Sequence, residues 1–177
     1  MGKWDATKIP YGISDFARIR REGYYYVDKT GYVPTVESAG SFLFFVRPRR
    51  FGKSLFVDML RCYYDLNEKT NFEKYFGDLA IGREPTPNRN KYLVLALDFS
   101  KVSGGDLSAQ ERNFDEYMCK RLDAFAMRYP DVFAPDFVKS CGGFAEVLRS
   151  TGACRPKDLD GPAGRLHPAI AVADHLL

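Results

Sequence analysis

The feature that most constrains the fold is a succession of three segments: an apolar run, a basic loop that contains glycine, and a helical pattern. Residues 41–46 read SFLFFV, without the alternation of a half-exposed strand, which is typical of a strand buried on both faces of a parallel sheet. The next residues, 47–54, read RPRRFGKS. From Lys53 to Asp65 apolar pairs recur four residues apart, which predicts a helix. The order strand, loop, helix favours an α/β class of fold.

Other segments add one strand and several helices to this prediction. The apolar run YLVLAL, residues 92–97, ends at Asp98 and predicts a second buried strand. Helices are predicted from apolar spacing, from N-cap residues and from residues that end a helix. The predicted ranges are about 16–19, after Ser14 or Asp15; 30–38, before Gly40; near 72–76; from a Ser108–Glu111 capping box to about Tyr129; and about 137–148.

Composition excludes several classes of protein. With 45% apolar and 28% charged residues, the chain is not expected to be disordered. No apolar run approaches the roughly 18 residues of a membrane-spanning helix, and the first ten residues lack the apolar core of a secretory signal. The net charge of +3 says little about partners. The four cysteines show neither CxxC nor zinc-finger spacing, so we expect reduced thiols in a cytoplasmic protein without a membrane partner.

The loop at 47–54 carries the candidate chemistry. A phosphate-binding loop has the pattern GxxxxGK[ST] between a strand and a helix, and Gly52, Lys53 and Ser54 match its end. Glycine lets backbone amides approach phosphate oxygens, and the helix N-terminus adds donors. The lysine reaches the β- and γ-phosphates, and the hydroxyl binds Mg²⁺. Arg47 replaces the first glycine of the pattern. We therefore predict ATP and Mg²⁺ as cofactors, with Ser54 as the Mg²⁺ ligand.

Three arginines of the loop leave alternatives open. Arg47, Arg49 and Arg50 add three positive charges. They would contact nucleotide phosphates, pair with acidic neighbours, or contact a nucleic acid. A nucleic-acid module needs a wider Lys/Arg face than one loop supplies.

Two longer segments carry a resemblance to a known family. IPYGISDFARIRREGYYYVDKT and FLFFVRPRRFGKSLFVDMLRCYYD resemble the bacterial predicted AAA-ATPase-like family, and the resemblance extends to about Arg149. The matching positions are the D-K-T element, residues 28–30, and the loop. The resemblance implies an ATP-binding domain whose nucleotide-binding residues are Arg47, Pro48, Arg49, Arg50, Phe51, Gly52, Lys53, Ser54 and Leu55. Members are often fused to a PD-(D/E)xK nuclease-like domain, which we do not expect in these 177 residues.

The end of the chain departs from the family pattern. The resemblance implies a further strand ending in Asp-Glu, whose Asp supports Mg²⁺ and whose Glu polarises water, but nothing after Arg155 offers one. Every Phe, Tyr and Trp falls at or before Phe144, and the tail is rich in Pro, Gly and Ala. We expect an AAA-ATPase-like region over 1–154 and an aberrant, poorly ordered tail without a strand over 155–177, as a frameshift or truncation would produce. The predicted fold is an incomplete P-loop NTPase core with a short N-terminal α/β extension.

Three further residues are candidates with two interpretations each. Asp28 would contact the nucleotide or Mg²⁺ and Lys29 would act electrostatically, or the D-K-T element only starts the next helix. Asp98 has no adjacent Glu and would serve as an acid or cap its strand. No catalytic residue is assigned. The predicted function is an ATP-binding, hydrolysis-deficient P-loop domain; the alternatives are a non-enzymatic nucleotide- or nucleic-acid-binding module, or a small-molecule kinase using Asp98. Nothing in the sequence sets the oligomeric state.

Overall fold

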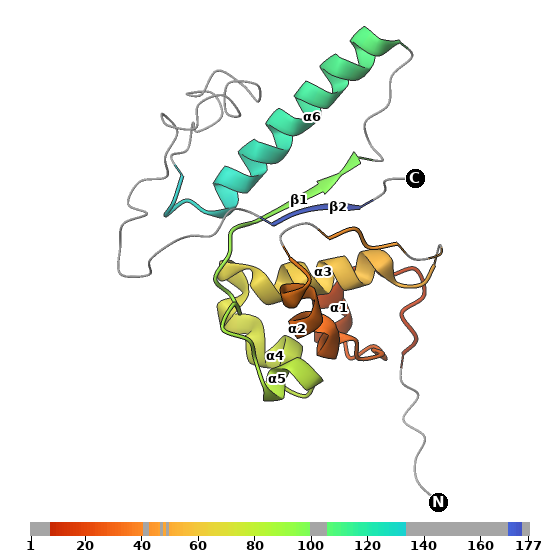
Figure 1. Cartoon of the computed structure of the whole chain (residues 1–177), viewed down its shortest axis with the longest axis vertical. Coiled ribbons are helices and arrows are strands. Elements are labelled where there is room, and N and C mark those ends of the chain that lie inside the picture. The colour runs from red at the N-terminus through yellow and green to blue at the C-terminus, as the bar shows by residue number, and fades with distance from the viewer. Residues whose placement is uncertain are drawn as a thin grey trace, which may run out of the picture. The chain divides into compact units, whose positions relative to one another are not determined.

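The chain divides into two compact units in the computed structural model (Figure 1). The first unit spans Met1–Lys91 and the second spans Tyr92–Leu177. The structure describes residues 8–40, 43–46, 48, 50–99, 106–133 and 170–174.

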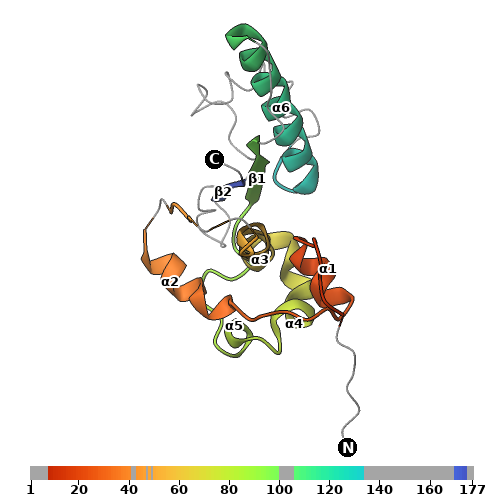
Figure 2. The ribbon, with the colours of Figure 1, turned by 90° about the vertical axis from the view of Figure 1, so that its right-hand side faces the viewer.

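The first unit is helical. Its helices at 16–21, 30–38, 53–64 and 72–76 follow the predicted pattern, whereas those at 66–71 and 80–83 were not predicted. In chain order the helices are α1 (Phe16–Arg21), the 3₁₀ helix η1 (Thr30–Tyr32), α2 (Val33–Ser38), α3 (Lys53–Tyr64), the 3₁₀ helix η2 (Leu66–Asn71), α4 (Phe72–Phe76) and α5 (Ala80–Arg83). Of the two predicted caps, Ser14 and Asp15, the N-cap of α1 is Asp15, whose side chain accepts from the Arg18 amide. An isolated parallel bridge joins Lys8 and Tyr24. In Figure 2 α1 and α4 lie beside α3, which is seen nearly end-on.

An aromatic core holds α1, α3 and α4 together. The rings of Phe16 and Phe76 have centroids 5.0 Å apart, and those of Tyr63 and Phe76 are 5.5 Å apart. All three side chains are fully buried. The Asp58 carboxylate of α3 also accepts the backbone N–H of Phe16 at 2.8 Å. Because aromatic side chains bury the largest apolar areas, this cluster determines how the three helices pack.

The predicted strand at 41–46 is not formed over its described residues. Residues 43–46 have neither helix nor strand, and residues 41 and 42 lie outside the described part. The side chains of Phe44 and Val46 are each 74% exposed, although Phe45 stacks on Phe56 of α3 at 5.1 Å. An apolar run becomes a strand only where a neighbour pairs its backbone N–H and C=O groups. No strand ladder or bridge among the described residues includes 43–46, so the prediction of a buried strand was wrong there.

The second unit contains a two-stranded parallel sheet. Its strands are β1 (Val94–Asp98) and β2 (Ile170–Asp174), with the Cα atoms of Val94 and Ile170 paired at one end and those of Asp98 and Asp174 at the other. β1 confirms the second predicted strand. With one small sheet among the described residues, the structure shows no clear α/β core, so the predicted fold class is confirmed only in part.

β2 corrects the expectation that the tail contains no strand. The segment reads IAVAD, and its alanines, which are depleted in strands, mask the β-branched Ile170 and Val172. Parallel pairing with β1 supplies the backbone partners that this short run needs. The strand ends in Asp174, which is followed by His175 and not by Glu. Residues 155–169 and 175–177 lie outside the described part of the chain.

Helix α6 (Leu107–Arg128) follows β1 in the second unit. Its N-cap is Asp106, whose side chain accepts from the Ala109 amide at 2.7 Å. The predicted capping box at Ser108 therefore lies two residues too late, because Asp106 already satisfies the first turn. The end of the helix before Tyr129 agrees with the prediction. The helix predicted over 137–148 lies outside the described residues.

Side chains of α6 and of its C-cap residue, Tyr129, bond to the backbone of β1 at alternate residues. The Val94 N–H donates to the Tyr129 hydroxyl at 2.9 Å, and the Asp98 N–H donates to the Tyr117 hydroxyl at 2.5 Å. Between them, the Arg121 guanidinium donates to the Ala96 carbonyl at 3.0 Å. Residues two apart in a strand direct their backbone groups to the same edge. These side chains thus bond to backbone N–H and C=O groups along one edge of β1, which protects that edge from pairing with other chains.

This arrangement predicts that the hydroxyl of Tyr129 stabilises the second unit. Tyr129→Phe leaves the buried amide of Val94 without its acceptor, and an unsatisfied buried donor costs about 1–3 kcal/mol. Urea unfolding followed by circular dichroism should show a loss of that size. Tyr11→Phe, at a 95% exposed tyrosine, is the matched control and should change nothing. Equal free energies of unfolding for Tyr129→Phe and the wild type would contradict the role.

Candidate functional site

The loop before α3 turns sharply at two left-handed residues. The Phe51 N–H donates to the Pro48 carbonyl at 3.4 Å, which closes a turn. Arg50 has φ 67° and Gly52 has φ 74°. Glycine adopts such angles at little cost, whereas other residues are strained there. Gly52 therefore allows the chain to enter the helix directly from the turn.

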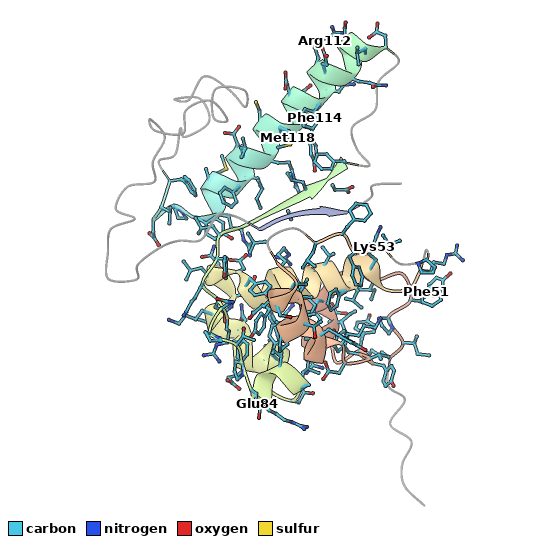
Figure 3. All side chains as sticks on the ribbon, in the orientation of Figure 1. Phe51, Lys53, Glu84, Arg112, Phe114 and Met118 are labelled. Atoms are coloured by element: carbon cyan, nitrogen blue, oxygen red, sulfur yellow. The ribbon has the colours of Figure 1, made fainter. Side chains whose placement is uncertain are left out.

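Helix α3 places Lys53 and Ser54 in its first turn. Gly52 is the N-cap, and the first hydrogen bond of the helix runs from the Phe56 N–H to the Gly52 carbonyl at 2.9 Å. The first amides of an α-helix have no intrahelical acceptor, and they carry partial positive charge. Lys53 and Ser54 are half-buried. Figure 3 shows Lys53 and Phe51 at this end of α3. Helix donors, an ammonium group and a hydroxyl thus gather at one helix terminus, as anion binding requires.

The rest of the predicted loop is described only in part. Arg47 and Arg49 lie outside the described residues. Pro48 and Arg50 are exposed, Phe51 is 63% exposed, and Leu55 is half-buried. Within the described part of the chain, Arg50 forms no ion pair. Its charge therefore adds to that of Lys53 at the same loop.

The D-K-T element is built around the carboxylate of Asp28. One carboxylate oxygen accepts from the Thr30 amide at 2.8 Å and from the Thr30 hydroxyl at 2.6 Å. The other accepts from the Ala80 amide of α5 at 2.8 Å. The Thr30 hydroxyl accepts in turn from the Ile81 amide at 3.2 Å. Both carboxylate oxygens of Asp28 thus accept hydrogen bonds within the protein, which supports a structural role for this residue.

These hydrogen bonds determine the acidity of Asp28. Partial burial raises the pKa of the carboxyl group, but the hydrogen bonds from Thr30 and Ala80 lower it further than burial raises it. The net effect holds the pKa of Asp28 below its ordinary value, because the bonds favour the charged form.

Lys29 reaches the loop from the D-K-T element. Its ammonium nitrogen lies 3.4 Å from the carbonyl oxygen of Phe51, a residue 22 positions later in the chain. A Cβ added to Gly52 would lie 3.3 Å from the same nitrogen. The structure therefore brings Lys29 together with Phe51 and Gly52, whereas the motif spacing left its role open.

Asp98 belongs to the second unit, where it ends β1. Its Cα pairs in register with that of Asp174, so both strands finish with an acidic residue at the same end of the sheet. Sequence reasoning missed Asp174; the signal that could have found it is the alternating Ile-Ala-Val-Ala run that precedes it. Among the described residues, no group of three or more His, Cys, Asp or Glu side chains forms a metal site.

Comparison with known proteins decides the family. The family model described as Predicted AAA-ATPase matches residues 10–152. The chain belongs to this family. It is also 52% identical over 62 residues to an uncharacterised protein of the vnfD 5′ region of Azotobacter chroococcum mcd 1.

The match to that Azotobacter protein covers 34% of this chain and only 12% of the relative's length. No solved structure matches the chain. In the part of the chain that the structure describes, no helix has the length and apolar character needed to span a membrane.

The hydrogen bonds of Asp28 predict a pH-dependent stability. Asp28→Asn replaces one accepting oxygen by a donor and should lower the free energy of unfolding at pH 7 by about 1 kcal/mol, since the side chain is exposed to solvent. Because the folded-state pKa is lowered, the carboxylate stabilises the fold above its ordinary pKa. This stabilisation is lost as the pH falls through the folded-state value. The difference between variant and wild type should therefore shrink between pH 7 and about pH 3, as measured by urea unfolding.

Glu84→Gln is the matched control, since Glu84 is an exposed carboxylate of the same unit (Figure 3). This control should leave the free energy of unfolding unchanged at both pH values. An Asp28→Asn difference that stays constant between them would contradict the assignment.

Proposed function

We propose that the chain is an ATP-binding P-loop domain of an AAA-type ATPase, with residues 47–55 around the polyphosphate of Mg·ATP. The observation that carries this proposal is the left-handed Gly52 directly before Lys53 and Ser54 at the start of α3. This conformation leads from a turn into a helix N-terminus, which is a natural site for phosphate. Membership of the Predicted AAA-ATPase family supports the same reaction class.

The residues of the loop have the chemistry that the ligand requires. Lys53 would neutralise the β- and γ-phosphates, and the amides of the first turn of α3 would donate to phosphate oxygens. The hydroxyl of Ser54 is an oxygen ligand of the kind that Mg²⁺ prefers. Arg50 adds charge from the exposed side of the turn. Bound Mg²⁺ would supply charge neutralisation at the phosphates.

The role of Lys53 predicts a loss of nucleotide affinity on substitution. Lys53→Ala removes one charge-assisted phosphate contact, worth on the order of 1.5–3 kcal/mol, and should weaken Mg·ATP binding about tenfold or more. Titration calorimetry measures this loss directly. Lys74→Ala, at an exposed lysine of α4, is the matched control and should bind like the wild type. Equal affinity of Lys53→Ala and the wild type would refute the assignment.

We further propose that the 177-residue chain alone hydrolyses ATP slowly. Neither strand of the described residues ends in the Asp-Glu pair: Phe99 follows Asp98 of β1, and His175 follows Asp174 of β2. A missing general base costs about 10²–10⁴-fold in rate. In a phosphate-release assay at saturating Mg·ATP, we expect turnover well below about 1 s⁻¹. A rate at or above that value would be incompatible with the proposal.

A further inference from the structure

The ammonium group of Lys29 is held at the phosphate loop by a contact outside the motif. Its nitrogen lies 3.4 Å from the Phe51 carbonyl oxygen, and the side chain is half-buried. A lysine ammonium has three donors and no acceptor. One carbonyl at this long distance therefore leaves most of its donor capacity for another acceptor.

Gly52 lies beside the ammonium group of Lys29. Any other residue at this position would place its Cβ 3.3 Å from the Lys29 nitrogen. The same glycine carries the φ of 74° at which α3 begins. The end of a flexible lysine can move by the small amount that a Cβ would require, so the positive φ is the stronger reason for glycine here.

No carboxylate of the described residues forms an ion pair with Lys29. The adjacent acid, Asp28, has both oxygens engaged by Thr30 and Ala80. Its contact with the Phe51 carbonyl lies at the surface, so an anion at the loop can reach the ammonium and neutralise its charge.

The backbone that carries Lys29 is firmly anchored. Thr30 is fully buried and accepts from the Ile81 amide. Asp28, on the other side of Lys29, accepts from the Ala80 amide. Because the two flanking residues are tied to α5, the lysine can reach the loop with little loss of backbone freedom on binding.

We propose that Lys29 is a second phosphate-binding lysine of the site, supplied by the D-K-T element in addition to Lys53. Its ligand is the polyphosphate of a nucleoside di- or triphosphate, and the Phe51 carbonyl holds the ammonium beside the loop that this group enters. This assignment rests on the proposed function of the loop. It extends the site from residues 47–55 to a residue that is 22 positions before Phe51 in the chain.

The test compares Lys29→Met, which removes the charge, with Lys29→Arg, which retains it. Calorimetric titration with Mg·ATP and with inorganic tripolyphosphate should show about tenfold weaker binding of both ligands by Lys29→Met. Lys29→Arg should stay within about threefold of the wild type. Between about 50 mM and about 300 mM salt, the affinity of Lys29→Met should fall less steeply, because one charge contact is gone. Lys74→Met, at an exposed lysine of α4, should resemble the wild type.

Three results would overturn the assignment, and they separate it from the proposed function. If Lys29→Met binds Mg·ATP as the wild type does, Lys29 is not a ligand, although the loop still binds nucleotide. If Lys29→Met and Lys29→Arg lose affinity equally, keep the wild-type salt dependence and melt at a lower temperature, Lys29 has only a structural role. If the wild type binds neither Mg·ATP nor tripolyphosphate, the proposed function fails together with this inference.

Discussion

The burial of one face of α3 is the constraint on which the first unit depends. Phe56, Met59 and Tyr63 lie three and four residues apart, so they share a face, and all three are buried. The last two are fully covered, with Tyr63 packed edge-on against Phe76 of α4 at an interplanar angle of 80°. Once this face is packed, the rotation of the helix about its axis is fixed. The directions of its N-terminal amides and of the Cα–Cβ bond of Lys53 are then fixed as well.

The core and the loop are therefore linked through one helix of 12 residues. The C-terminal half of α3 carries most of the packing, and its N-terminus carries the groups that we propose to bind phosphate. Asp58, between these parts, accepts the Phe16 amide at 2.8 Å and the Arg61 guanidinium at 2.7 Å. It ties α1 to α3 close to the loop. A rigid helix of this kind suits a binding site, because groups that are already positioned lose little freedom when a ligand arrives.

The features that could be predicted from sequence are those set by local contacts. The helix at Lys53, its preceding Gly52 and the Asp15 cap each depend on residues within a few positions, and the structure has them where they were expected. The run at 43–46 was misread because strand formation depends on a partner elsewhere in the chain. β2 was missed for the converse reason, since a weak local pattern is completed by pairing with β1.

The candidate site shows the same division between local and distant information. Lys53 and Ser54 follow from the motif, whereas the approach of Lys29 to Phe51 crosses 22 residues and no local pattern encodes it. The D-K-T element does engage the charge of Asp28 separately from that of Lys29. Asp28 directs both oxygens to backbone and hydroxyl donors, including the Ala80 amide. By engaging the carboxylate within the fold, the element leaves a positive charge at the loop, which is the sign that a polyphosphate requires.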